Sequence, residues 1–253
     1  MLLFHANNLS HHGLERVFEL AKKAGFDGIE IGINQNVDTH NPEYLKTLEA
    51  RYELPIRAFS LDEKKDEGLI KVYQATVREF TGCTLNLHPA GSFSFKYQRW
   101  LKEVAPKLAK KYQHKLCFRN LPQESMLGVI PKRKANNLDA LKNQGSVCLD
   151  LSALALSNYD VIQAVSVLKS KMRHIYLSNM YRRVPYSLPD RGVLPVESFL
   201  TKLAKLDYGA DFTVKVSGKA FSEGNEDMTL EKMQDTVNFF KKYFSPDGQT
   251  KEL

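Results

Sequence analysis

The chain has 253 residues, 43% of them hydrophobic, and 36 Lys and Arg against 29 Asp and Glu give it a net charge of +7. This composition can bury a large core, and no Pro-, Gly- or Ser-rich stretch divides the chain, so we expect one domain over residues 1–244 and a disordered tail over 245–253. No run approaches the ~18 apolar residues of a membrane span, and no secretion signal opens the chain. The sequence therefore predicts a cytoplasmic protein with no membrane partner.

Predicted strands alternate with predicted helices along the chain. The strands are expected at Leu2–Ala6, Gly28–Ile33, Pro55–Leu61, Cys83–His88, Lys115–Asn120, Ser146–Asp150, His174–Ser178 and Asp211–Val216. The helices are expected at Gly13–Ala24, Pro42–Tyr52, Leu69–Phe80, Phe93–Tyr112, Pro131–Asn143, Tyr159–Ser170, Pro195–Leu206 and Thr229–Tyr243, with a kink or break at Pro106.

Eight such units predict a single-domain α/β fold, the (β/α)8 TIM barrel. Strands joined through helices run parallel, and right-handed crossovers let eight of them close with the helices outside. A doubly wound open sheet is the alternative. It needs a Gly-rich phosphate turn after its first strand, where this chain has Asn7–His12 instead.

In such a barrel the chemistry sits at the carboxyl ends of the strands, where polar residues recur. Glu30, His88 and Lys215 are the candidate catalytic residues. The candidate ligand-binding residues at the strand ends are His5, Arg119, Asn120, Asp150, Tyr176 and Asn179. Arg183 and Arg191, in the long loop after the seventh strand, are candidates for holding a phosphate or carboxylate.

Motifs at these ends resemble the xylose-isomerase-like TIM-barrel superfamily, which contains sugar-phosphate isomerases and epimerases and the family 2 AP endonucleases. The resemblance is carried by Gly25–Glu30, His88–Ser92, Arg119–Pro122, Cys148–Ser152 and Leu188–Gly192. It implies the (β/α)8 fold and, in the typical member, a divalent metal held by Glu, Asp and His from the later strands.

The sequence departs from that pattern at the implied metal ligands. Arg119 and Lys215 stand where the resemblance implies glutamates, whereas Glu30, His88 and Asp150 match. A like pair of unit charges ~4 Å apart costs about 4 kcal/mol at an effective dielectric of ~20, and a dication opposite one cation about twice that. We therefore expect no metal cofactor and a degenerate metal site that binds a small anionic, sugar-derived molecule.

Three functional hypotheses remain open. The first is a metal-independent isomerase or epimerase, with Glu30 or His88 as base and Arg119 or Lys215 stabilising the enediolate. In a variant of it, Lys215 forms a Schiff base. The second is a non-catalytic ligand-binding or regulatory barrel. An AP-site endonuclease ranks lowest, because the resemblance implies that this chemistry relies on several clustered metal ligands, and most of the matching positions hold other residue types here. Nor does a regular stripe of basic and aromatic residues indicate a nucleic-acid partner.

Overall fold

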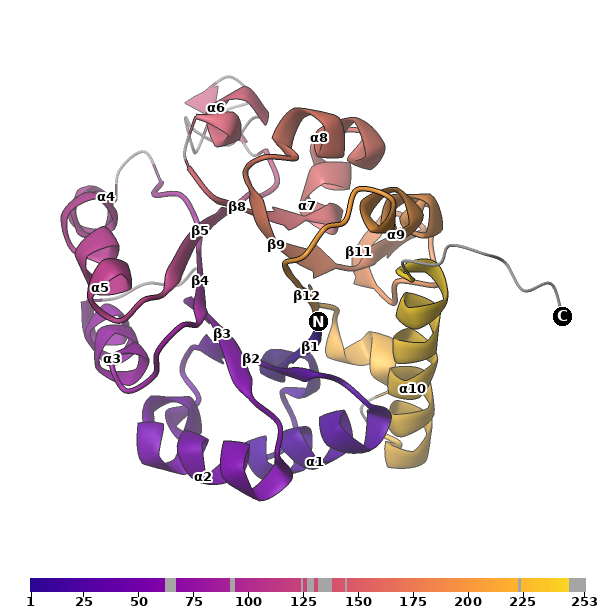
Figure 1. Cartoon of the computed structure of the whole chain (residues 1–253), viewed down its shortest axis with the longest axis horizontal. Coiled ribbons are helices and arrows are strands. Elements are labelled where there is room, and N and C mark those ends of the chain that lie inside the picture. Colours follow the sequence, from indigo (N-terminus) through magenta and orange to yellow (C-terminus); the bar gives the residue numbers. More distant parts are fainter. Residues whose placement is uncertain are drawn as a thin grey trace, which may run out of the picture.

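The computed structural model describes residues 1–61, 67–91, 94–123, 125–126, 130–131, 138–143, 145–222 and 224–245. Within these residues, parallel strands close into a barrel surrounded by helices (Figure 1). The barrel strands are β1 (Leu2–His5), β2 (Gly28–Ile33), β3 (Ile56–Leu61), β4 (Thr84–Leu87), β5 (Lys115–Arg119), β8 (Val147–Asp150), β9 (Met172–Leu177) and β12 (Asp211–Val214). Their order around the barrel is β1-β12-β9-β8-β5-β4-β3-β2, which confirms the predicted TIM barrel.

The helices follow the strands and form the outer layer (Figure 1). They are α1 (Leu14–Ala24), α2 (Pro42–Tyr52), α3 (Glu67–Val77), α4 (Phe95–Glu103), α5 (Ala105–Lys111), α6 (Leu138–Lys142), α7 (Leu151–Leu156), α8 (Val161–Leu168), α9 (Val196–Ala204) and α10 (Glu226–Tyr243). Short 3-10 helices lie at Ala6–Leu9 (η1), Val37–His40 (η2) and Gly218–Phe221 (η3). Across the described ranges, none of the helices has both the length and the apolar character that crossing a bilayer requires.

Local signals explain where several helices begin and end. The Asn41 side chain accepts a hydrogen bond from Tyr44 N and caps α2, with Pro42 in its first turn. Gly25, at φ 88°, ends α1 in the left-handed conformation that glycine adopts without strain. The helix expected over Phe93–Tyr112 is interrupted at Val104, and Pro106 lies in the first turn of α5. The predicted break is therefore present.

Side chains alternate between the barrel interior and the outer core. On β2, Ile29, Ile31 and Ile33 belong to the main apolar cluster between strands and helices. Glu30, between them, is fully buried and makes its contacts to other strands across the barrel interior. A separate small apolar cluster of Cys117, Cys148 and Tyr176 lies inside the barrel, so the interior is packed and is not an open channel.

Several short elements were not expected from the sequence. The loop after β9 folds into an antiparallel hairpin of β10 (Asn179–Tyr181) and β11 (Val184–Ser187), and α7 directly follows β8. A second hairpin pairs β6 (Ser125–Met126) with β7 (Ile130–Pro131). Of the helix expected over Pro131–Asn143, the described part contains only α6. The predicted tail falls almost wholly outside the described residues, which end at 245.

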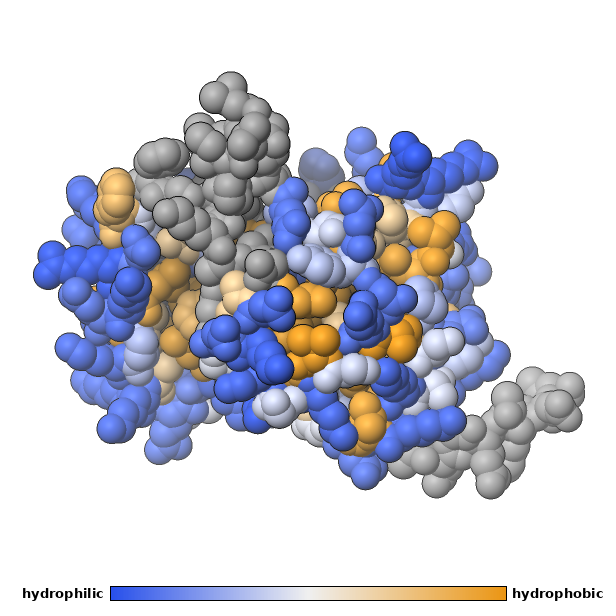
Figure 2. Space-filling view, turned by 90° about the horizontal axis from the view of Figure 1, so that it is seen from above, coloured by the Kyte–Doolittle hydropathy of each residue, from blue (hydrophilic) through white to orange (hydrophobic). Residues whose placement is uncertain are grey.

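The outside of the barrel is largely hydrophilic where the outer helices face water. Figure 2 shows one such face, with apolar side chains gathered near its middle and charged or polar side chains around them. The three cysteines, Cys83, Cys117 and Cys148, are buried and free. The last two lie in the interior cluster.

Candidate functional site

The buried carboxylate of Glu30 is the centre of a polar network inside the barrel. Tyr176 donates its phenolic hydrogen to Glu30 Oε1. Thr213 Oγ1 and Asn86 Nδ2 donate to Glu30 Oε2 at 2.8 and 3.2 Å. His174 Nε2 lies 3.2 Å from the same oxygen. Both carboxylate oxygens therefore receive hydrogen bonds from the protein.

These hydrogen bonds keep Glu30 ionised despite its burial. Burial alone would raise the pKa of this carboxyl, but the hydrogen bonds from His174 and Tyr176 and the nearby His5 hold it well below its usual value. Burial and the Glu30 charge in turn raise the pKa of Tyr176 well above its usual range, so the phenol stays protonated and donates. Because both of its oxygens already accept hydrogen bonds from the protein, Glu30 is suited to positioning its neighbours and to an electrostatic role.

His5 is held as a neutral imidazole beside Glu30. Its Nδ1 accepts a hydrogen bond from Asn7 N at 3.2 Å, which leaves the ring hydrogen on Nε2. Nε2 lies 3.2 Å from Ser60 Oγ and 3.7 Å from Glu30 Oε1. Burial lowers the pKa of His5 to about 3, against the opposing effect of Glu30. The ring packs over the end of β2, where a Cβ at Gly32 would lie 2.9 Å from His5 Cε1.

Above this network, two cations lie against one aromatic ring. Lys215 Nζ is 4.4 Å from the centroid of the Tyr176 ring, and Arg119 Cζ is 5.6 Å from it. Both distances are in the range of cation–π interactions. The structure therefore brings together Arg119, Tyr176 and Lys215, three of the residues that the sequence predicts for the site.

Lys215 is more accessible to solvent than Arg119, the other cation at the Tyr176 ring. It is half-buried just beyond the end of β12, whereas Arg119 is buried. Within the described part of the chain, no carboxylate or carbonyl oxygen lies within hydrogen-bonding distance of its Nζ. Burial, followed by repulsion from Arg119, lowers the pKa of Lys215 to about 8, while Asp150 and Glu30 act in the opposite direction.

Asp150 and Asn120 connect the ends of β8 and β5. Asp150 Oδ1 caps α7 by accepting a hydrogen bond from Ala153 N at 3.0 Å, and Tyr186 donates to Oδ2 at 3.5 Å. The Asn120 amide spans the two strands, since its Nδ2 donates to Asp150 O at 3.0 Å and its Oδ1 accepts from Asp150 N at 2.6 Å. Where the two strands end, the Asn120 side chain thus makes the two hydrogen bonds to Asp150 that a backbone segment of a neighbouring strand would otherwise make.

Asn179 organises the loop that follows β9. Its Nδ2 donates to Pro189 O at 2.9 Å, and its Oδ1 accepts from Met180 N and Leu194 N at 2.8 and 2.9 Å. A Cβ at Gly192 would lie 2.3 Å from this Oδ1, so the loop packs directly on the amide. The Asn179 amide therefore makes its hydrogen bonds to other groups of the protein.

The structure leaves the two predicted loop arginines exposed. Arg183 lies at the turn between β10 and β11, where it and Arg182 both have positive φ, and Arg191 lies beside Asp190 with Nε 3.6 Å from Oδ2. His88, by contrast, is buried at the end of β4, with its ring 5.3 Å from that of Tyr97 and its Nδ1 3.2 Å from Pro89 O. Neither arginine contacts Tyr176 as Arg119 and Lys215 do.

Sequence reasoning missed three network members, Asn86, His174 and Thr213. Each lies two residues before a predicted site residue, namely His88, Tyr176 or Lys215, within the strands expected from the sequence. Side chains two apart on a strand face the same way, so this spacing is the signal that could have identified them. Tyr186 was also missed. Its left-handed φ of 60° is unusual for an aromatic residue, and such residues cluster at functional sites.

The described residues at the strand ends do not fit a divalent metal. Among the described residues, no three His, Cys, Asp or Glu side chains are placed to hold a metal ion together. The Glu30 oxygens already accept hydrogen bonds from Tyr176 and Thr213. Hard cations need several oxygen ligands, whereas the cations Arg119 and Lys215 both lie against the ring of Tyr176, whose hydroxyl donates to Glu30.

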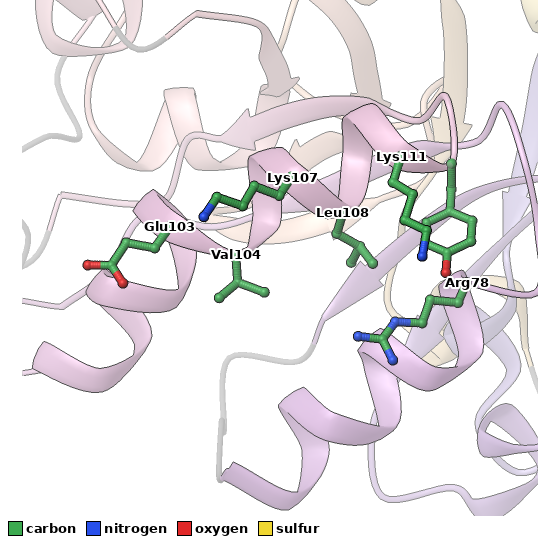
Figure 3. A pocket seen from close by; sticks show the side chains of 7 residues that line it. Arg78, Glu103, Val104, Lys107, Leu108 and Lys111 are labelled. Atoms are coloured by element: carbon green, nitrogen blue, oxygen red, sulfur yellow. The ribbon is translucent and has the colours of Figure 1, made fainter.

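A basic hollow of about 430 Å³ lies outside the barrel, away from the strand ends. Figure 3 shows Lys107, Leu108 and Lys111 along α5 and Arg78 just beyond α3. Its three cationic side chains are exposed, whereas Arg119 at the strand ends is buried. An exposed basic face of this kind is typical of a solvated helix surface.

Comparisons with known proteins identify the fold. No protein family and no curated protein matches the sequence. D-allulose 3-epimerase from Methylomonas sp., solved in complex with D-allulose, is 15% identical, with a TM-score of 0.64 over 96% of each chain. A xylose isomerase domain containing protein from Salmonella typhimurium is 14% identical, with a TM-score of 0.68 over 94% of this chain and 96% of that one. A sugar phosphate isomerase/epimerase from Parabacteroides distasonis is 11% identical, with a TM-score of 0.68 over 96% and 95%.

These likenesses confirm, at the level of fold, the resemblance seen in the sequence. The chain has the fold of the xylose isomerase-like TIM barrels, which sugar isomerases and epimerases share. Because one fold supports many activities, the activity has to be argued from the residues at the strand ends.

Proposed function

We propose that this barrel binds a small anionic, sugar-derived molecule at the carboxyl ends of its strands, without the divalent metal that the resemblance implies. The observation that carries the proposal is the placement of Arg119 and Lys215 against the Tyr176 ring. Two cations beside one buried ring repel each other, and a bound phosphate or carboxylate relieves that repulsion. The D-allulose bound to the Methylomonas epimerase supports a sugar-like ligand for this fold.

Titration calorimetry with D-ribose 5-phosphate, and with uncharged D-ribose for comparison, tests this proposal. We expect binding of the phosphate ester in the presence of EDTA. Loss of one charge-assisted hydrogen bond costs about 1.5–3 kcal/mol, so Arg119→Met is expected to weaken binding about 10- to 100-fold. Lys107→Met, in the outer hollow, is the matched control and is expected to bind as the wild type does. A requirement for Mn²⁺, or full binding by Arg119→Met, would refute the proposal.

Turnover by a metal-independent isomerase needs a base as well as a cation. The sequence predicts Glu30 or His88 for this step, and Lys215 can stabilise the negative charge that develops on the enediolate oxygen. Exchange of a sugar C–H hydrogen for deuterium from D₂O, followed by NMR with EDTA present, detects that step directly. Loss of exchange in His88→Gln, with binding retained, would identify His88 as the base.

A non-catalytic ligand-binding barrel is the second candidate, and one observation favours it. Both oxygens of Glu30 accept hydrogen bonds from protein donors, so this carboxylate is not available to a substrate in the present arrangement. This candidate predicts binding of anionic sugars without deuterium exchange in any of them. Deuterium exchange in even one sugar phosphate would exclude a non-catalytic barrel.

A further inference from the structure

We infer that Lys215 is a nucleophilic amine that forms a Schiff base with the carbonyl group of an anionic, sugar-derived ligand whose charge pairs with Arg119. The inference rests on the proposed function and deepens it, because it names the reactive atom and the group on the ligand. It follows from the position of Nζ, from the charges around it and from its access to the strand ends.

The position of the amine is the first argument. Lys215 Nζ lies 4.4 Å over the Tyr176 ring, and in the described residues no oxygen acceptor holds it. A structural lysine is normally tied to a carboxylate or a carbonyl, whereas this amine can turn toward a ligand. The residue is half-buried just past the end of β12, on the side of the barrel where the carboxyl ends of the strands lie.

The charged groups around Lys215 set the balance between its ammonium and neutral amine forms. Arg119 lies against the same ring, and it disfavours a second positive charge. Asp150, Glu30 and Cys148 act in the opposite direction and favour the ammonium form. Burial and Arg119 outweigh them, so that the pKa of Lys215 falls to about 8. At pH 7 roughly one amine in ten is then neutral, compared with roughly one in three thousand at the ordinary pKa.

The chemistry consumes nothing beyond the ligand. The neutral amine nitrogen forms a bond to the carbonyl carbon, and a proton moves from nitrogen to the carbonyl oxygen. Loss of water leaves a carbon–nitrogen double bond. Arg119 remains charged throughout, and its guanidinium offers a positive charge to a phosphate or carboxylate on the same ligand. A carbonyl compound with an anionic group a few bonds away is therefore the expected partner.

Reductive trapping with glycolaldehyde phosphate and sodium cyanoborohydride, read by intact mass and peptide mapping, tests the inference. We expect one adduct, on Lys215, formed at least tenfold faster than any adduct on exposed lysines. Lys215→Arg keeps the charge and is expected to lose this adduct, whereas Lys219→Arg, which removes an exposed lysine four residues later, is expected to keep it. Circular dichroism of each variant verifies that it is folded.

Several outcomes would overturn the inference. Labelling spread over exposed lysines, or unchanged in Lys215→Arg, would show that Lys215 is not the nucleophile. Equal rates with uncharged glycolaldehyde would refute the anionic class of ligand. If D-ribose 5-phosphate binds to the wild type and weakly to Arg119→Met, yet no adduct forms, the Schiff base fails while the proposed binding function stands. If binding is absent as well, both fail.

Discussion

Tyr176 donates a hydrogen bond to Glu30 from a strand that is not the neighbour of the Glu30 strand in the barrel. Lys215 and Arg119 both lie against the ring of the same Tyr176. One side chain thus joins the buried anion to the two cations at the strand ends. A phenol whose hydroxyl is bonded to a carboxylate is also electron-rich, which strengthens the attraction between its ring and nearby cations.

Tyr176→Phe is expected to lower the free energy of unfolding by about 1.5–3 kcal/mol. The substitution keeps the ring but removes a hydrogen bond to a buried charge. Urea denaturation followed by circular dichroism measures the change. Tyr208→Phe is the matched control, because the Tyr208 hydroxyl is also buried and has no hydrogen-bond partner among the described residues. Removal of the Tyr208 hydroxyl is expected to change the free energy of unfolding by less than about 0.5 kcal/mol. Equal decreases in the free energy of unfolding of the two variants would contradict the stabilising role of the hydrogen bond between Tyr176 and Glu30.

His5 is expected to make stability depend on pH in the mildly acidic range. Its pKa is about 3 in the folded chain and 6.5 when unperturbed, so between these values the unfolded chain binds a proton that the folded chain does not. Stability is therefore lost as pH falls below about 6.5, by up to about 1.4 kcal/mol per pH unit.

The contribution of His5 is the difference between wild type and His5→Asn in how the free energy of unfolding depends on pH. Denaturation at pH 5.0 and 7.5 is expected to show a smaller pH effect in the variant, because an amide does not titrate. His11→Asn, at an exposed histidine, is expected to behave as the wild type does. An unchanged slope in His5→Asn would mean that His5 is protonated in the folded protein.

The barrel could be predicted because its signals are local. Apolar runs of strand length recur eight times, and residues such as Gly25 and Asn41 end or begin helices by hydrogen bonds within a few residues. The residues at the strand ends followed from the fold, since parallel strands place their carboxyl ends at one rim. The Arg119, Tyr176 and Lys215 group was predictable for that reason.

The buried network was not predictable, because it depends on contacts between strands far apart in the sequence. Glu30 meets Thr213 only because β1 closes the barrel against β12. The β10–β11 hairpin was missed for a different reason. Its turn places Arg182 and Arg183 at positive φ, where a glycine or asparagine would have signalled a hairpin. Tyr186 is brought toward Asp150 by that hairpin.

Asn120→Ala is expected to destabilise the protein without acting on ligand binding directly. The amide makes two hydrogen bonds to the Asp150 backbone, and their loss leaves buried groups unsatisfied at a cost of about 1–3 kcal/mol. Asn8→Ala is a matched comparison, because Asn8 Nδ2 donates to Val214 O and its Oδ1 accepts from Val216 N in the same way. Both variants are expected to unfold at lower urea concentration. Undiminished stability with weaker binding of D-ribose 5-phosphate would instead support the ligand contact that the sequence predicts for Asn120.

Arg119→Met is expected to raise the pKa of Lys215 from about 8 toward the ordinary lysine value of 10.5. Repulsion from Arg119 is the second cause of the lowered value, and without it Asp150 and Glu30 act against burial alone. The rate at which an acylating reagent modifies Lys215, followed by mass spectrometry from pH 6 to 10, reports the fraction of neutral amine. The midpoint of that profile is expected to move to higher pH in Arg119→Met and to stay in place in Arg183→Met, because Arg183 is exposed at the hairpin turn. A shift in Arg183→Met would show that the hairpin arginine acts on Lys215. A profile unchanged by Arg119→Met would mean that the two cations at the Tyr176 ring do not interact, which would remove the basis for an anion between them.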